Sequence, residues 1–316
     1  MLQIQEKTVV CQTHKALLYL LVRYGNGALP LPLLRTLAVQ MRLYPNGQAV
    51  NRAVRELREA GVLDRQTWVD NNSDLILVRK FALRFLFNKT SQEIATPQRP
   101  RTMAPYILQA RKVDWLLGAM EKKHLDTLMS VETFMKKHAC SLFCRLPMLP
   151  AYYRDYAGVL EREKPGNYRE QLARLEGEPQ TNPGPTLEQL HRRGIYITDI
   201  TPQKRTIQLV SFPGREMGAE RVMDWTIEAH QWAVSLLPYY HTYHYLYALD
   251  GPHKEALRAA LTATAPDTTA TPYWDYRLQG ARLSGAVQIG VTDSGFIKQW
   301  CGNIRRTGIY SNHQKT

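Results

Sequence analysis

Cysteine and long apolar runs are both scarce in this chain. Four cysteines occur among 316 residues, at Cys11, Cys140, Cys144 and Cys301. No stretch approaches the roughly 18 consecutive apolar residues of a membrane span. The N-terminal residues also lack the basic region and the apolar core of a secretion signal. We therefore expect free thiols, a reducing cytoplasmic compartment and no membrane partner.

Motifs of known catalytic sites are missing as well. The sequence contains no glycine-rich phosphate loop, no nucleophile elbow and no HExxH zinc motif. Asp199 and Gln208 fall near the acidic positions of a restriction-type nuclease, but the paired acid and the lysine are not present. The sequence therefore predicts no catalytic centre, although chemistry hidden in residues 187–300 stays open as an alternative.

Spacing also argues against a metal site. Cys140 and Cys144 have three residues between them, whereas a zinc knuckle has two. His241 and His244 lie three positions apart and would point to opposite faces of a strand, whereas a relaxase needs two histidines on one face. We expect buried thiols at both cysteines, no metal and no cofactor.

What the chain has in excess is positive charge, with a formal net charge of +13 at pH 7. Residues 1–150 carry 22 Lys and Arg against 11 Asp and Glu, a net of +11, whereas residues 151–250 carry 11 against 13, a net of −2. A basic first half indicates attraction to a polyanion such as nucleic acid, since neutralising phosphates releases counterions. A basic but inert surface is the alternative.

Two proline-rich breaks divide the chain into three parts. Three prolines lie within residues 96–105 and a second group lies within residues 164–186, and proline disrupts regular structure. With 44% hydrophobic and 22% charged residues, the composition is that of a folded protein. We expect an α+β multidomain protein with parts at 8–92, 105–160 and 186–302.

Hydrophobic periodicity predicts three helices in the first part, at residues 13–24, 31–40 and 48–60. Asn46 is placed to cap the N-terminus of the third helix. Gly61 is placed to end that helix in a left-handed conformation.

The third helix has two faces of different chemistry. Its apolar face consists of Val50, Ala53, Val54 and Leu57. Its polar face carries amide and guanidinium groups at i, i+3, i+4 and i+7, on Gln48, Asn51, Arg52 and Arg55. Arg suits guanine, and Asn or Gln suits adenine, in the major groove of DNA. A solvated outer face of a core helix is the alternative.

A hairpin follows the third helix directly. Residues 62–69 and 75–78 predict two strands joined by the polar turn 70–74. The segment AVNRAVRELREAGVL, residues 49–63, resembles the recognition helix and first wing strand of winged helix-turn-helix proteins. These are DNA-binding domains of bacterial transcription factors and mobile-element proteins, and the resemblance covers residues 9–85.

The resemblance implies contacts with double-stranded DNA. The major groove would receive Gln48, Asn51, Arg52 and Arg55. Phosphate contacts, which position a protein without specifying a sequence, would come from Arg58, Arg65, Arg79 and Lys80.

The segments around the hairpin add two smaller expectations. The turn carries Asp70 and Asp74 and no basic residue, which predicts that its tip stands off the minor groove. Arg99 and Arg101 are candidates for an extended minor-groove arm, with a solvated tether as the alternative.

The middle part is expected to be helical, because apolar residues recur at helical spacing between residues 107 and 135. Helices beside a winged helix commonly supply dimer contacts, so residues 105–160 are a candidate for homodimerisation. An internal helical layer is the alternative.

The last part predicts an α/β domain. Strands are expected at 195–198, 207–212, 243–249 and 286–291, and helices at 220–236, 253–262 and 294–300. Within the aromatic run, one strand face would hold Tyr239, His241, Tyr243, Tyr245 and Tyr247. Such a face suits either stacking on bases or a ligand, or packing in a core.

Together these expectations describe a cytoplasmic bacterial, plasmid or phage protein that binds a specific duplex and regulates transcription, or replication or transfer of a mobile element. The C-terminal domain would bind a small-molecule or protein effector. This layout is similar, without residue-level matches, to replication-relaxation proteins of mobile elements. Two alternatives stay open: a nucleic-acid-processing enzyme or accessory subunit, and a protein–protein adaptor that docks through the winged helix.

Overall fold

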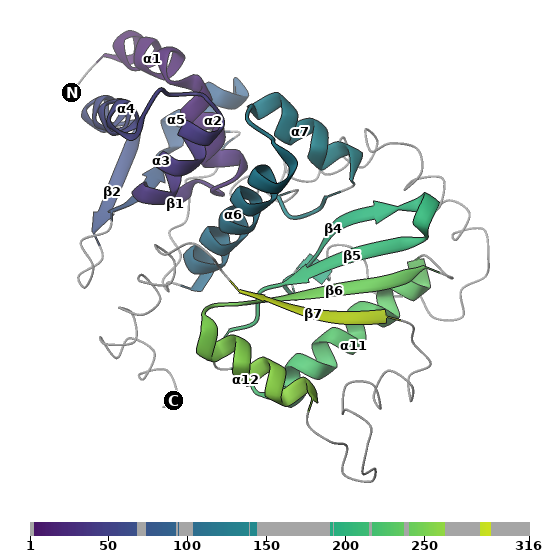
Figure 1. Ribbon diagram of the computed structural model, residues 1–316. Coiled ribbons are helices and arrows are strands. Elements are labelled where there is room, and N and C mark those ends of the chain that lie inside the picture. Colours follow the sequence, from purple (N-terminus) through teal and green to yellow (C-terminus); the bar gives the residue numbers. More distant parts are fainter. Residues whose placement is uncertain are drawn as a thin grey trace. The chain divides into compact units, whose positions relative to one another are not determined.

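The computed structural model describes residues 3–67, 74–92, 94, 104–138, 140–143, 190–191, 193–214, 217–236, 240–262 and 285–291 (Figure 1). The chain forms two compact units. The first comprises residues 1–132, 145–157 and 293–316, and the second comprises residues 133–144 and 158–292. Both contain helices and a small sheet, so the expected α+β class is confirmed. The helix expected at 294–300 lies outside the described residues.

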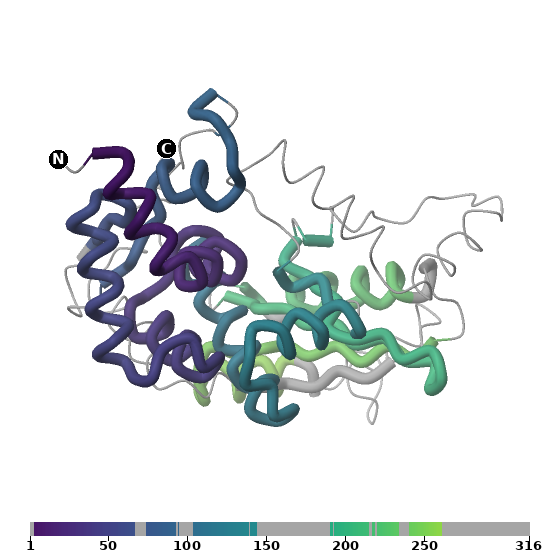
Figure 2. Tube along the Cα trace, turned by 90° about the horizontal axis from the view of Figure 1, so that it is seen from above, coloured from purple at the N-terminus to yellow at the C-terminus, as the bar shows by residue number. Residues whose placement is uncertain are grey.

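Helices dominate the described part of the first unit. In chain order its elements are α1 (Ile4–Thr13), α2 (Lys15–Arg23), β1 (Ala28–Pro30), α3 (Leu31–Gln40), α4 (Gly47–Glu59), β2 (Leu63–Thr67), β3 (Asp74–Val78), α5 (Lys80–Phe87) and α6 (Ala104–Lys123). The following helix, α7 (Leu128–Lys137), begins in this unit. Contacts join α1 to α2 and α4, and α3 to α4, and these purple and blue helices lie together in Figure 2.

The three expected helices correspond to α2, α3 and α4, and the expected hairpin corresponds to β2 and β3. The sheet has the strand order β1-β3-β2, and both pairings are antiparallel. Leu75, Ile76, Leu77 and Val78 are all buried, because β3 lies in the middle of this sheet. The tip of the hairpin, including Asp70, lies outside the described residues.

Sequence periodicity did not indicate α1, β1 or α5. Cys11 is the one buried residue on α1, so that helix has almost no apolar repeat to recognise. The strand β1 is three residues long and is defined by its pairing with β3. Such elements depend on tertiary contacts, which local patterns do not encode.

A partly buried ion pair links α2 to the middle of α7 within the first unit. Arg23 donates from Nε and Nη2 to the two carboxylate oxygens of Glu132, at 3.1 and 3.2 Å. The Tyr24 hydroxyl donates to Glu132 Oε1 at 2.6 Å. Burial and the neighbouring carboxylate hold the pKa of Tyr24 well above its usual value. Bidentate geometry makes this a strong, directional link.

The second unit is built on a four-stranded mixed sheet. Its elements are β4 (Ile195–Thr201), η1 (Pro202–Lys204), β5 (Thr206–Ser211), α11 (Ala219–Leu236), β6 (His241–Ala248), α12 (Gly251–Thr262) and β7 (Gly285–Val291). The strand order is β4-β5-β6-β7; β4 and β5 are antiparallel, whereas β5, β6 and β7 are parallel. The alternating strands and helices expected for this part are confirmed.

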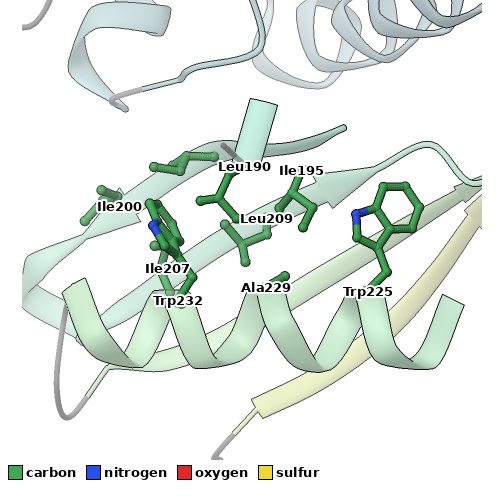
Figure 3. Close-up of a cluster of buried hydrophobic side chains, with 10 residues drawn as sticks. Leu190, Ile195, Ile200, Ile207, Leu209, Trp225, Ala229 and Trp232 are labelled. Atoms are coloured by element: carbon green, nitrogen blue, oxygen red, sulfur yellow. The ribbon is translucent and has the colours of Figure 1, made fainter. Parts of the chain in front are cut away.

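One face of this sheet is covered by helices. The helix α11 contacts β6 and α12, and α12 contacts β6 and β7, so both connecting helices lie on the same side (Figure 1). An apolar core cluster lies between α11 and the strands, as Figure 3 shows. Strand residues in this cluster are Ile195, Ile197, Ile200, Ile207 and Leu209, and helix residues are Trp225, Ala229, Trp232 and Ala233. Positions i, i+4, i+7 and i+8 form one apolar stripe on α11.

Two histidines are buried within this layer. His230 on α11 and His244 on β6 are each 0% exposed, and their ring centroids lie 5.8 Å apart. His244 Nε2 is hydrogen-bonded to the Ser211 hydroxyl at 2.8 Å. Burial lowers the pKa of His230 below 6.5 and lowers that of His244 well below 6.5. Both imidazoles are therefore neutral in the folded protein at pH 7.

We expect the second unit to lose stability as the pH falls below 6.5. The unfolded chain binds protons on His230 and His244 near pH 6.5, whereas the folded chain does not, so acid favours unfolding. Each proton bound only by the unfolded chain changes the free energy of unfolding by about 1.4 kcal/mol per pH unit. Urea titrations at several pH values, followed by tryptophan fluorescence, measure this slope.

His244→Gln should reduce the slope, because it removes one of the two groups. The matched control is His124→Gln, which replaces an exposed histidine of the first unit and should keep the wild-type slope. Equal slopes in the wild type and His244→Gln would contradict the assignment.

Candidate nucleic-acid interface

The helix α4 has well-defined ends. Asn46 Oδ1 accepts a hydrogen bond from the backbone N–H of Ala49 at 3.0 Å, as expected for an N-cap. At the other end, Gly61 has a φ of +70°, and its N–H donates to the carbonyl of Arg58 at 2.8 Å. The left-handed conformation expected at Gly61 is thus confirmed, and it turns the chain from α4 toward β2.

The two faces of α4 differ in exposure as the sequence predicts. Its apolar residues are at most 3% exposed: Val50, Ala53, Val54 and Leu57. On the opposite side lie exposed polar residues: Gln48, Asn51, Arg52, Arg55 and Arg58. The amide and guanidinium groups are therefore directed to solvent by the burial of the other face.

The dimensions of α4 suit the major groove of B-DNA. An α-helix with its side chains is about 10–12 Å across, and the major groove is about 12 Å wide. Gln48 and Arg55 are seven residues apart on the helix, which corresponds to about 10 Å along its axis. That length spans about three base pairs at 3.4 Å each.

The cations on α4 are only weakly engaged within the protein. Arg55 Nε lies 4.0 Å from Glu59 Oε1, and both side chains are more than two-thirds exposed. Such surface pairs contribute little to stability and exchange readily with another anion. Across the described ranges, no carboxylate forms an ion pair with Arg52 or Arg58. These guanidinium groups are available to an external partner.

The candidate phosphate-binding residues of the hairpin are paired with its own acids. Arg65 forms an ion pair with Asp74 on the neighbouring strand. Arg79 Nη2 lies 3.5 Å from Asp64 Oδ1, and the Arg79 side chain is about half exposed. Lys80, the first residue of α5, is half-buried. To contact phosphates, Arg65 and Arg79 would have to give up their ion pairs with Asp74 and Asp64.

The sequence also predicts a candidate minor-groove arm in the linker. Arg99 and Arg101 lie outside the described residues.

A polar network that the sequence did not indicate holds α4 in place. His14 lies between α1 and α2, and its Nδ1 is hydrogen-bonded to the Tyr44 hydroxyl at 2.9 Å. Its Nε2 is 2.9 Å from Glu56 Oε2 on α4. Burial and the nearby Glu56 carboxylate raise the pKa of Tyr44 to about 12, so this hydroxyl keeps its proton. His14 thus joins two residues that lie 30 and 42 positions further along the chain, Tyr44 and Glu56.

The cysteines behave as expected where they are described. Cys11 and Cys140 carry buried thiols, and burial raises the pKa of the Cys11 thiol to about 11. Cys144 and Cys301 lie outside the described residues. Among the residues that the structure describes, no group of three or more His, Cys, Asp or Glu side chains is placed to hold a metal ion.

No helix within the described ranges combines the length and the apolar character that crossing a bilayer requires.

Comparison of the chain with protein-family models, curated proteins and solved structures found no match. The chemistry of α4 and its surroundings is therefore what supports a function for this chain.

We expect His14→Ala to destabilise the first unit by about 1–2 kcal/mol, because it leaves the partly buried Tyr44 hydroxyl and the Glu56 carboxylate without their shared partner. Urea unfolding at pH 7 measures the change. Gln12→Ala, at an exposed position on α1, is the matched control and should stay within about 0.5 kcal/mol of the wild type. Unchanged stability in His14→Ala would show that the network does not hold α4.

Proposed function

We propose that this chain is a sequence-specific double-stranded DNA-binding protein, with a winged helix-turn-helix domain in its first unit. The observation that carries the proposal is the exposed face of Gln48, Asn51, Arg52 and Arg55, which lies opposite a fully buried apolar stripe. In this proposal α4 is the recognition helix.

The order of elements supports a winged helix. The helices α2, α3 and α4 are followed by the β2–β3 hairpin, whose strands form an antiparallel sheet with β1. In a helix-turn-helix domain the recognition helix enters the major groove while neighbouring elements contact the backbone. The β2–β3 hairpin, which begins four residues after α4, would be the wing.

The side chains of α4 match the chemistry of base edges. Arg52 and Arg55 can each donate two hydrogen bonds to O6 and N7 of guanine. Gln48 and Asn51 can each bond to N6 and N7 of adenine. Such bidentate contacts distinguish bases, whereas the phosphate contacts proposed for Arg58, Arg65, Arg79 and Lys80 set the position on the duplex.

Charge distribution supports the same partner. The net charge of +11 on residues 1–150 favours association with DNA, whereas residues 151–250 carry a net of −2. Positive charge on the DNA-binding part raises the rate of encounter and makes affinity depend on salt.

Binding of one duplex site suits a regulator of transcription, or of replication or transfer of a mobile element. In this proposal two copies bind two half-sites, since helix-turn-helix proteins read two-fold symmetric sites as dimers. The second unit would carry the effector or the partner contact.

Selection of bound sequences from a random duplex pool tests the proposal with the full chain. A consensus should emerge, and a two-fold symmetric one would support the dimer. Arg52→Ala and Arg55→Ala should each weaken binding to the consensus duplex by about 1–3 kcal/mol, measured by fluorescence anisotropy.

Lys122→Ala is the control for the loss of a cation elsewhere, because Lys122 is exposed on α6. It should leave affinity for the consensus unchanged. Failure to bind any duplex at about 50 mM salt, where phosphate contacts are strong, would contradict the proposed function. Equal affinity of the wild type and both arginine variants would remove α4 as the recognition helix.

A further inference from the structure

The second sheet has two edges, and the chain protects the β4 edge. The backbone N–H of Ser141 donates to the carbonyl of Ile197 at 2.9 Å, and the N–H of Ile197 donates to the Ser141 hydroxyl at 2.9 Å. The pairing of β4 with β5 also shifts in register between Ile197 and Asp199, where a charged residue follows the irregularity. Irregular pairing, charge and a covering segment all hinder an edge strand from pairing with another chain.

The β7 edge lacks the features that protect β4 (yellow in Figure 1). Within the strands that the structure describes, β7 pairs with β6 alone. Its seven residues stay in register with β6 from Gly285 to Val291, without the shift seen in β4. The strand sequence GAVQIGV contains no charged residue and no proline. A regular, uncharged edge of this kind is a template for pairing with a further strand.

The order of residues along β7 suits pairing with a second copy of the same strand. A two-fold axis perpendicular to a sheet makes the two copies of an edge strand antiparallel. With the axis at Gln288, this residue faces its own copy, and Val287 faces Ile289 of the partner subunit. The next pair is Ala286 with Gly290. Each pair is matched in size, and the pair beside the axis consists of β-branched residues, which favour strands.

Charge also favours a contact at this strand. The chain carries a net charge of +13, so two copies repel each other wherever their basic parts meet. Most of the excess lies in residues 1–150, whereas β7 belongs to the second unit and is itself uncharged. Pairing along β7 therefore places no like charges opposite each other on the two strands.

We propose that two copies of this chain dimerise through β7, paired antiparallel about a two-fold axis at Gln288. The product is one sheet of eight strands, four from each copy, and both of its outer edges are β4. Only the protected edges then remain, and the closed symmetry prevents the addition of further copies. The role of this dimer rests on the proposed function, since it supplies two copies of α4, one for each half-site of a two-fold symmetric duplex.

Charge substitution at the two-fold axis tests the pairing in the full chain. Sedimentation velocity up to about 100 µM should show the mass of two chains, since a contact with a micromolar Kd is then populated. Gln288→Lys and Gln288→Glu should each weaken the dimer by about tenfold or more, because like charges then face each other. An equimolar mixture of the two variants brings opposite charges face to face and should restore the dimer. Mixing would not restore a variant that fails to fold.

The matched controls are Gln203→Lys and Gln203→Glu, because Gln203 is exposed in the connection between β4 and β5. Both should dimerise as the wild type does. A wild-type chain that keeps the mass of one copy at every concentration overturns the proposal. A dimer that persists in both Gln288 variants also overturns it, and moves the contact to another part of the chain such as residues 105–160.

Failure of the dimer and failure of duplex binding are seen in separate measurements. Sedimentation is carried out without DNA, and Arg52→Ala should weaken duplex binding while leaving the dimer mass unchanged. Gln288→Lys should weaken binding to a duplex with two half-sites and leave binding to one half-site unchanged. An added lysine attracts phosphates, so such a loss cannot come from its charge. Equal affinity of the wild type and Gln288→Lys for two half-sites would overturn the role of the dimer in DNA binding.

Discussion

Burial of four apolar side chains on α4 is the constraint on which the first unit depends. Val50, Ala53, Val54 and Leu57 are removed almost completely from water. Burying a side chain of this kind contributes roughly 1.5–3 kcal/mol for a valine or leucine, so rotation of the helix about its axis is strongly opposed. The opposite face must therefore meet solvent, and it carries the guanidinium and amide groups. Hydrophobic burial thus orients polar groups that themselves contribute little to folding.

Burial also fixes which side chains of β6 share a face, but here the pattern repeats every two residues, as in any strand. Alternation along a strand sends His244 and Leu246 into the layer beneath α11, and it sends Tyr243 and Tyr245 to the other side. His244 is buried and hydrogen-bonded to Ser211. A shift of the strand by one residue would therefore bury a tyrosine in its place. The direction of the other side chains on α4 and β6 is therefore fixed by the residues buried behind them.

Local sequence patterns predicted much of the fold and of the candidate site. The three helices, the hairpin and both faces of α4 followed from apolar periodicity, since solvent exposure of a helical residue repeats every 3.6 positions. The sequence also placed His241 and His244 on opposite faces of a strand, and the structure confirms this. Local sequence patterns did not predict contacts between residues that are far apart in the chain, such as the hydrogen bond between Asp199 and His138. Their meeting depends on chain topology, and no spacing within one element encodes it.

The sequence by itself determined which residues share a face, because side-chain direction along a helix or a strand is a matter of backbone geometry. It determined the charge contrast between the first half and the middle of the chain in the same direct way. Tertiary structure alone decided the order β4-β5-β6-β7 and the network of His14, Tyr44 and Glu56. The reason is that strand order and long-range hydrogen bonds arise from competition among all possible partners, and only the folded chain brings the chosen partners within a few ångströms.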